Sequence, residues 1–147
     1  MRRRALLSGL TAAATVGLAG CSAMDDDDDD PATLDRMLLR SDTGEPELLS
    51  LTLVYAPRDG SNERPIWGTF EAPAADEPRA VTDFEGDPGF YSLTAVSDRH
   101  HTHEVVSFNS HGAAVGAGPL QFEVVVQESG DLWANLGEAG DEVSIPA

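Results

Sequence analysis

Residues 49–55 read Leu-Ser-Leu-Thr-Leu-Val-Tyr and residues 120–126 read Leu-Gln-Phe-Glu-Val-Val-Val, and these two stretches decide the fold class. In each of them, large apolar side chains recur at every second position. Successive side chains of an extended chain point to opposite faces, so this period of two predicts a β-strand with one buried face. No window of a dozen residues repeats apolar side chains at helical spacing, and we therefore expect an all-β protein.

Shorter candidate strands surround these two stretches, and turn signals rich in glycine, aspartate and proline separate nearly all of them. Short strands at this spacing are typical of a β-sandwich. We predict a single antiparallel sandwich of about seven to nine short strands over residues 34–147, which is long enough to bury a core without disulfides. The shorter candidates are residues 37–40, 66–71, 80–84, 90–96, 105–108, 132–136 and 143–145.

The first 20 residues have a basic start followed by an apolar run, which is the pattern of a secretory signal peptide. Arg3 and Arg4 are followed after one position by two leucines, and they resemble the twin-arginine export signal. Leu18-Ala19-Gly20-Cys21 resembles a lipobox, whose cysteine accepts a lipid before cleavage, and Cys21 is the only cysteine of the chain. The resemblance implies a signal peptide over residues 1–20 and a lipid anchor on Cys21, which would hold the protein on the outer face of the cell membrane. The alternative is a buried free thiol.

Residues 21–33 contain six consecutive aspartates, Asp25 to Asp30. Charges this dense repel one another, and the composition offers little apolar surface to bury, so we expect an extended, disordered acidic linker. A loose site for divalent cations is the alternative, but consecutive aspartates lack the turns that would direct their oxygens to one ion.

The charge balance of the whole chain narrows the classes of partner. Its 147 residues include 26 acidic and 9 basic residues, for a net charge of −17. Because a nucleic-acid binder needs a cationic face, we expect no nucleic-acid partner. All the basic residues are arginine, and this absence of lysine beside an acid excess resembles proteins of extremely halophilic archaea. The resemblance implies a halophilic protein whose fold needs molar salt to screen its self-repulsion.

The segment Asp87-Pro88-Gly89-Phe90-Tyr91 resembles the D-x-G-x-Y turn of immunoglobulin-like sandwiches. In that family the tyrosine hydroxyl bonds back to nearby backbone, which implies a structural role for Asp87, Gly89 and Tyr91. Leu93 stands where the family cysteine would follow, and Trp67 lies closer to Tyr91 than in a full immunoglobulin domain. We therefore expect a smaller relative, such as a transthyretin-like or carboxypeptidase-regulatory-like sandwich. The chain as a whole also resembles lipoproteins that halophilic archaea encode in large numbers, which implies no activity.

Four histidines lie between His100 and His111. In an extended segment His101 and His103 point to one face, and with His111 or Glu104 they could bind Zn²⁺ or Cu²⁺. A solvated polar loop is the alternative. Acid–base catalysis is a third possibility, for which neighbouring serines at 107 and 110 are candidates only by proximity.

Several other residues have both a structural and a functional interpretation. We interpret Trp67 and Trp133 as core or rim aromatics, with sugar stacking as the alternative. Residues 112–118 are glycine-rich, but they lack the lysine and the helix of a phosphate-binding loop, so we interpret them as a flexible connection. The three carboxylates of residues 83–87 could chelate Ca²⁺, although such clusters arise readily by chance in an acidic chain.

With Cys21 lipidated, the mature chain would have no thiol for a disulfide, a thiolate metal site or a cysteine nucleophile. We therefore expect a non-catalytic binding or interaction module rather than an enzyme. It would need no cofactor and would contact an unknown protein or small molecule through loops at one end of the sandwich. The alternative function is a metal-binding surface lipoprotein that holds Zn or Cu in the His100–His111 cluster.

Overall fold

The fold is taken from a computed structural model that describes residues 31–74, 78–112 and 118–140. The expected signal peptide, the lipidation site at Cys21, the aspartate run and the candidate strand at 143–145 lie outside these residues. None of the described residues forms a helix of the length and hydropathy needed to cross a membrane.

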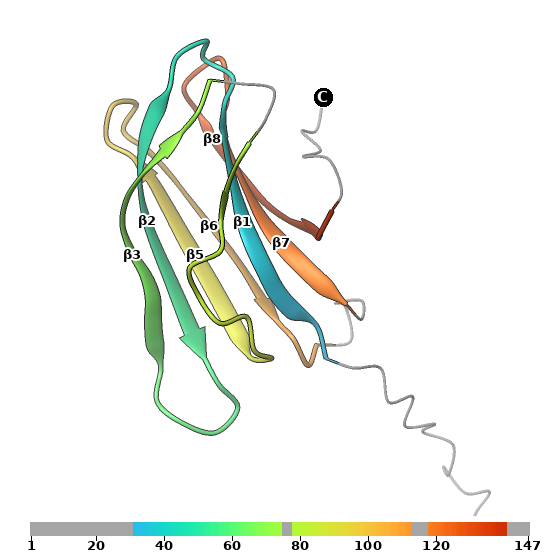
Figure 1. Ribbon diagram of the computed structural model, residues 1–147. Helices are drawn as coiled ribbons and strands as arrows, with labels where there is room; N and C mark the ends of the chain where they lie inside the picture. The colour runs from blue at the N-terminus through green and yellow to red at the C-terminus, as the bar shows by residue number, and fades with distance from the viewer. Residues whose placement is uncertain (1–30, 75–77, 113–117, 141–147) are drawn as a thin grey trace, which may run out of the picture.

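The described chain consists of eight β-strands joined by turns and loops (Figure 1). This confirms the all-β prediction, and every shorter candidate strand within the described residues overlaps an observed strand. The first strand begins at Thr33 and Ala32 is already buried, so the folded part starts slightly before the expected boundary at residue 34. The strands are β1 (Thr33–Ser41), β2 (Glu47–Ala56), β3 (Glu63–Ala72), β4 (Arg79–Val81), β5 (Phe90–Ser97), β6 (Thr102–Asn109), β7 (Pro119–Val126) and β8 (Leu132–Glu138).

The strands form two four-stranded sheets that pack face to face as a β-sandwich (Figure 1). Sheet A has the order β4-β1-β7-β8, and sheet B has the order β3-β2-β5-β6. All neighbours are antiparallel except β1 and β7, which run parallel. The prediction of a wholly antiparallel sandwich was therefore wrong at this pair. The chain returns to sheet A at β4, on one side of β1, and reaches the other side of β1 at β7 only after β5 and β6 in sheet B. No tight hairpin therefore joins β1 to β7 and forces the two strands to be antiparallel.

The core lies between the two sheets. In β2, Leu49, Leu51 and Leu53 point inward and are at most 1% exposed, as their period of two predicts. Each such leucine stabilises the fold by about 1.5–3 kcal/mol relative to an exposed side chain.

Strand β7 differs from its expected pattern of one buried face. Its inward residues are buried, but so are Gln121, Glu123 and Val125 on the outward face. The neighbouring strands β1 and β8 flank these positions, but an interior place in the sheet does not by itself bury an outward face, since the outward residues of the interior strands β2 and β5 are half-buried or exposed. Gln121 Nε2 donates a hydrogen bond to Glu123 Oε1 at 2.8 Å, so the buried carboxylate has a polar partner. In β7, polar residues at alternate positions therefore did not indicate a solvent-exposed face.

Candidate functional site

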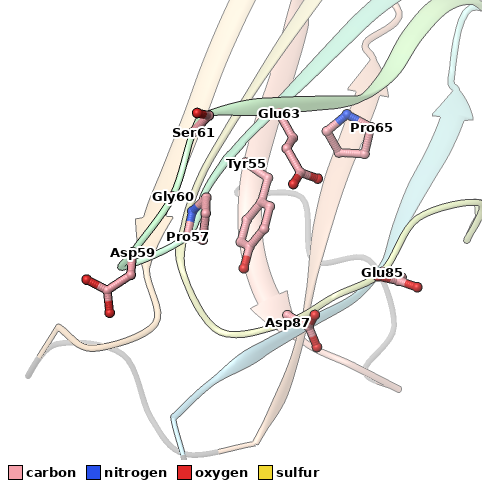
Figure 2. Close-up of a pocket in the computed structure, with 9 residues that line it drawn as sticks. All are labelled: Tyr55, Pro57, Asp59, Gly60, Ser61, Glu63, Pro65, Glu85 and Asp87. Carbon is pink, nitrogen blue, oxygen red and sulfur yellow. The ribbon is translucent and has the colours of Figure 1, made fainter.

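A pocket of about 550 Å³ opens at one end of the sandwich, between the β2–β3 loop and the β4–β5 loop (Figure 2). Tyr55, at the end of β2, stands between the two loops, and Pro57 and Pro65 form part of the wall. The other feature of the lining is its charge, which comes from four carboxylates. They are Asp59 in the β2–β3 loop, Glu63 in β3, and Glu85 and Asp87 in the β4–β5 loop.

Close backbone packing at glycine holds the β4–β5 loop in place. The Leu34 N–H donates a hydrogen bond to the Gly86 carbonyl at 3.1 Å, and a Cβ on Gly86 would overlap the Leu34 carbonyl oxygen. A Cβ on Gly89 would overlap the Tyr55 ring, and the Gly89 N–H donates to Ser110 Oγ at 3.0 Å. The loop can therefore lie this close to β1 and β2 only because both residues lack a side chain.

Two tyrosines attach the same loop to the core. The Tyr91 hydroxyl donates to the Asp87 carbonyl at 2.5 Å, and the Tyr55 hydroxyl donates to the Pro88 carbonyl at 3.3 Å. The two rings stack with centroids 4.9 Å apart, and Tyr91 stacks in turn on Phe108 at 5.2 Å. The floor of the pocket is thus continuous with the aromatic part of the core. Asp87, Gly89 and Tyr91, which the sequence placed in one structural turn, lie together here.

The electrostatic environment of the pocket is negative. Burial raises the pKa of Tyr55, and the charges of Asp87 and Glu63 raise this pKa further. The ion pairs between described residues join Arg36, Arg40, Arg99 and His100 to acids elsewhere, and none includes a pocket carboxylate. Within the described part of the chain, four carboxylates therefore line this pocket without a basic partner.

We expect Tyr91→Phe to lower the free energy of unfolding by about 1–2 kcal/mol at neutral pH, because the hydrogen bond to Asp87 is lost in a buried setting. The variant should also be less sensitive to alkali. Burial raises the pKa of Tyr91, and the nearby Tyr55 and the charges of Asp87 and Glu63 raise it further. At high pH the folded state therefore keeps a proton that the unfolded chain loses. The resulting stability is complete below about pH 10 and declines as the pH rises further.

Urea unfolding of wild type and Tyr91→Phe between neutral pH and about pH 11 measures both effects. Tyr55→Phe is the matched control, since Tyr55 is the only other tyrosine and is less buried. Equal losses of stability with pH in wild type and Tyr91→Phe would contradict this account.

The structure does not bring together His101, His103 and His111, the candidate metal ligands of the alternative function. His101 lies in the β5–β6 turn with a left-handed backbone φ of 55°, which breaks the alternation expected of an extended segment. His103 lies near the start of β6, whereas His111 follows its end, and an eight-residue strand spans about 27 Å. No group of three or more His, Cys, Asp or Glu side chains among the described residues is placed to hold a metal ion, and this includes the carboxylates of residues 83–87.

A buried carboxylate lies at the opposite end of the sandwich, and it was not predicted from the sequence. Glu47 is 2% exposed, and its Oε1 lies 3.0 Å from Arg99 Nη1 and 3.2 Å from His100 Nε2. This cluster joins the start of β2 to the β5–β6 turn. Glu47 occupies an odd-numbered position of β2, as the inward-facing leucines do. This alternation was the sequence signal that could have predicted its burial.

The other singled-out residues have simple positions. Of the two tryptophans interpreted as core or rim aromatics, Trp67 is 77% exposed on the outer face of sheet B and so is not a core residue, and Trp133 is half-buried in β8. Ser107 is exposed, while Ser110 is buried and accepts the Gly89 hydrogen bond, which gives it a structural role. The pocket beside the β2–β3 loop was not predicted from the sequence, because one acid among 26 carries little information.

Comparison of the chain with protein-family models, with curated proteins and with solved structures found no match.

Proposed function

We propose that the protein is a non-catalytic binding module whose pocket between the β2–β3 and β4–β5 loops accepts a cationic group. The group would be an alkylammonium or a guanidinium, carried by a small amine or by a basic side chain of a partner protein. The observation that carries the proposal is the set of four carboxylates that line this pocket with no basic partner among the described residues.

The lining suits this chemistry. A volume of about 550 Å³ falls in the range of small-molecule sites. Carboxylates accept charge-assisted hydrogen bonds from ammonium and guanidinium groups, and these are stronger than neutral ones. The Tyr55 ring adds an aromatic surface on which a cation can pack. A phosphate or carboxylate ligand would be repelled by the same lining.

We propose further that the sandwich is immunoglobulin-like and that the protein is attached to the outer face of the cell membrane through a lipid on Cys21. The hydrogen bond from Tyr91 to the Asp87 carbonyl supports the first assignment, because such a bond defines the tyrosine corner of that family. Arg3, Arg4 and the lipobox-like residues before Cys21 support the second. Because β1 begins beside Gly86, such an anchor would keep the pocket end of the sandwich on the membrane side.

Calorimetric titration of the full chain with spermidine, arginine methyl ester and a tetra-arginine peptide tests the pocket. We expect one-to-one binding of at least one probe. Glu63→Gln and Asp87→Asn should each weaken binding about three- to tenfold, since each removes one charge from the lining without changing its shape. Tighter binding of the peptide would indicate a protein partner, and tighter binding of spermidine would indicate a small amine.

Glu128→Gln is the matched control, because Glu128 is an exposed acid in the β7–β8 turn at the other end of the sandwich. It removes the same charge from the molecule and should leave the affinity unchanged. An equal loss of affinity in Glu128→Gln and Asp87→Asn would show that the net charge attracts the cation, and the pocket assignment would then be wrong.

A further inference from the structure

A second pocket opens beside the first, at the same end of the sandwich. Its volume is about 330 Å³, and its lining residues come from the end of β2 and the loop after it, the start of β5, and the end of β6. Pro57 lines both pockets, so the two are neighbours across this residue. The β4–β5 loop is shared as well, because Asp87 lines the first pocket and Gly89 lines the second. These two shared segments fix the position of one pocket relative to the other.

The second pocket differs from the first in its charge. Its titratable side chains are those of Arg58 and His111, both basic, and none of the described residues that line it is acidic. Neither side chain forms an ion pair or a hydrogen bond with a described residue. Asn109 adds a neutral donor, because its Oδ1 accepts a hydrogen bond from the His111 N–H at 3.1 Å, which leaves its NH2 group for a ligand. The second pocket therefore offers hydrogen-bond donors, whereas the first offers acceptors.

Arg58 and Asp59 show how close the two kinds of lining are. They are adjacent in the β2–β3 loop, yet Arg58 lines the second pocket and Asp59 lines the first, and the two form no ion pair. Adjacent Cα atoms lie about 3.8 Å apart, so the basic and the acidic lining begin within one residue of each other. A single small molecule can therefore reach both pockets.

We infer that the two pockets together bind a molecule of the size of a basic amino acid, which carries both a cationic side chain and a carboxylate. This inference rests on the proposed function and defines its ligand more closely. The ammonium or guanidinium group lies among the four carboxylates of the first pocket. The carboxylate lies in the second pocket, where it accepts hydrogen bonds from Arg58, Asn109 and His111. A guanidinium such as that of Arg58 can hold a carboxylate by two parallel bonds.

The wall between the charged groups suits the rest of such a ligand. The Phe90 ring lines the second pocket and is 43% exposed, and Pro57 lies between the two pockets. Both offer apolar surface to the methylene groups that separate the two charges of arginine or lysine. A simple polyamine has no group for the second pocket, so it would use only part of the site.

Calorimetric titration of the full chain with arginine and with arginine methyl ester tests the inference. Both probes carry the guanidinium, but the ester lacks the carboxylate. Because the ester has the larger positive charge, simple attraction to a chain with a net charge of −17 would favour the ester. We expect the opposite order, with arginine binding at least about fivefold more tightly through the charge-assisted bonds of the second pocket.

The peptide Gly-Gly-Arg, with a free carboxylate, distinguishes two sources of this chemistry. Tighter binding of arginine than of the peptide would support a free amino acid as the ligand. Tighter binding of the peptide would support the C-terminal residue of a peptide. In both cases the amide of the same peptide, which lacks the carboxylate, should bind at least about fivefold more weakly than the acid.

Arg58→Gln should reduce the preference for arginine over its ester at least about threefold, because it removes the charged donor of the second pocket. Arg79→Gln is the matched control. Arg79 is exposed at the start of β4 and pairs with Leu39, near the end of β1 that lies away from the pockets. It forms no ion pair with a described residue, so its substitution removes the same charge and should leave the preference unchanged.

Equal binding of arginine and its ester, or a preference for the ester, would overturn the inference. A preference for arginine that Arg58→Gln and Arg79→Gln change equally would overturn it as well. If the ester still bound and lost affinity in Asp87→Asn, the proposed cation pocket would stand and only the second pocket would be rejected. Absence of binding by every cationic probe would overturn both proposals.

Discussion

Gly86→Ala is expected to lower the free energy of unfolding by about 3 kcal/mol, at the upper end of what overpacking costs. The added Cβ would overlap the Leu34 carbonyl oxygen, and because this atom belongs to the backbone of β1 it cannot rotate away. The β4–β5 loop would have to move off β1, and the hydrogen bond from the Leu34 N–H to the Gly86 carbonyl would lengthen or break. Urea unfolding of the variant measures the cost.

Gly68→Ala is the matched control for this prediction. A Cβ on Gly68 in β3 would meet its nearest neighbour, Phe70 Cε2, at 3.6 Å, which is an ordinary van der Waals contact. Its stability should stay within about 0.5 kcal/mol of wild type or rise slightly, because alanine reduces the entropy of the unfolded chain. Since Glu85 and Asp87 flank Gly86, the Gly86→Ala variant should also lose affinity for the cationic probes. A Gly86→Ala protein as stable as Gly68→Ala would show that the loop does not pack against β1 in this way.

Glu47→Ala is expected to lower the free energy of unfolding by about 2–3 kcal/mol, through the loss of charge-assisted hydrogen bonds at a buried carboxylate. Its Oε1 contacts Arg99 and His100, and the hydroxyl of Thr43 lies 3.4 Å away. Arg99 is 58% exposed and can be solvated when its partner is removed, so the cost stays below that of stranding a buried charge. Thermal or urea unfolding gives the measurement.

Glu45→Ala tests whether burial is the reason. Glu45 pairs with the same arginine, with Oε2 at 3.2 Å from Arg99 Nη2, but its side chain is 68% exposed. An exposed ion pair contributes at most about 1 kcal/mol, so this variant should be close to wild type. Equal losses in Glu45→Ala and Glu47→Ala would contradict the structural role given to the buried carboxylate.

Local patterns in the sequence predicted the fold class well, because alternating apolar and polar side chains indicate β-strands, and glycine and proline indicate the turns between them. The leucines of β2 are an example, since their spacing gave both the strand and its buried face. The pairing of β1 with β7 could not be predicted, because it depends on the return of the chain from the other sheet. The burial of Glu123 on the outward face of β7 is also a tertiary property, which no local pattern records.

The candidate site was predicted less well than the fold. Asp87 and Tyr91 were assigned to one turn from a short motif, but the pocket needs Tyr55 and Glu63 from another hairpin, and their proximity is a tertiary property. The histidines drew attention through their spacing in the chain, yet β6 carries His103 and His111 toward opposite ends of the sandwich. Trp67 was interpreted as core or rim from its strand pattern, which does not reveal which side of β3 faces solvent.

The most direct test of the central claim is an amide chemical-shift map of the full chain during titration with spermidine. Binding in the pocket predicts the largest shifts at Tyr55, Gly60, Ser61 and Asp87, with little change at Glu128 and the β7–β8 turn. Shifts of similar size at every exposed acid, including Glu128, would show that the cation follows the overall charge, and would contradict the assignment of this pocket as the binding site.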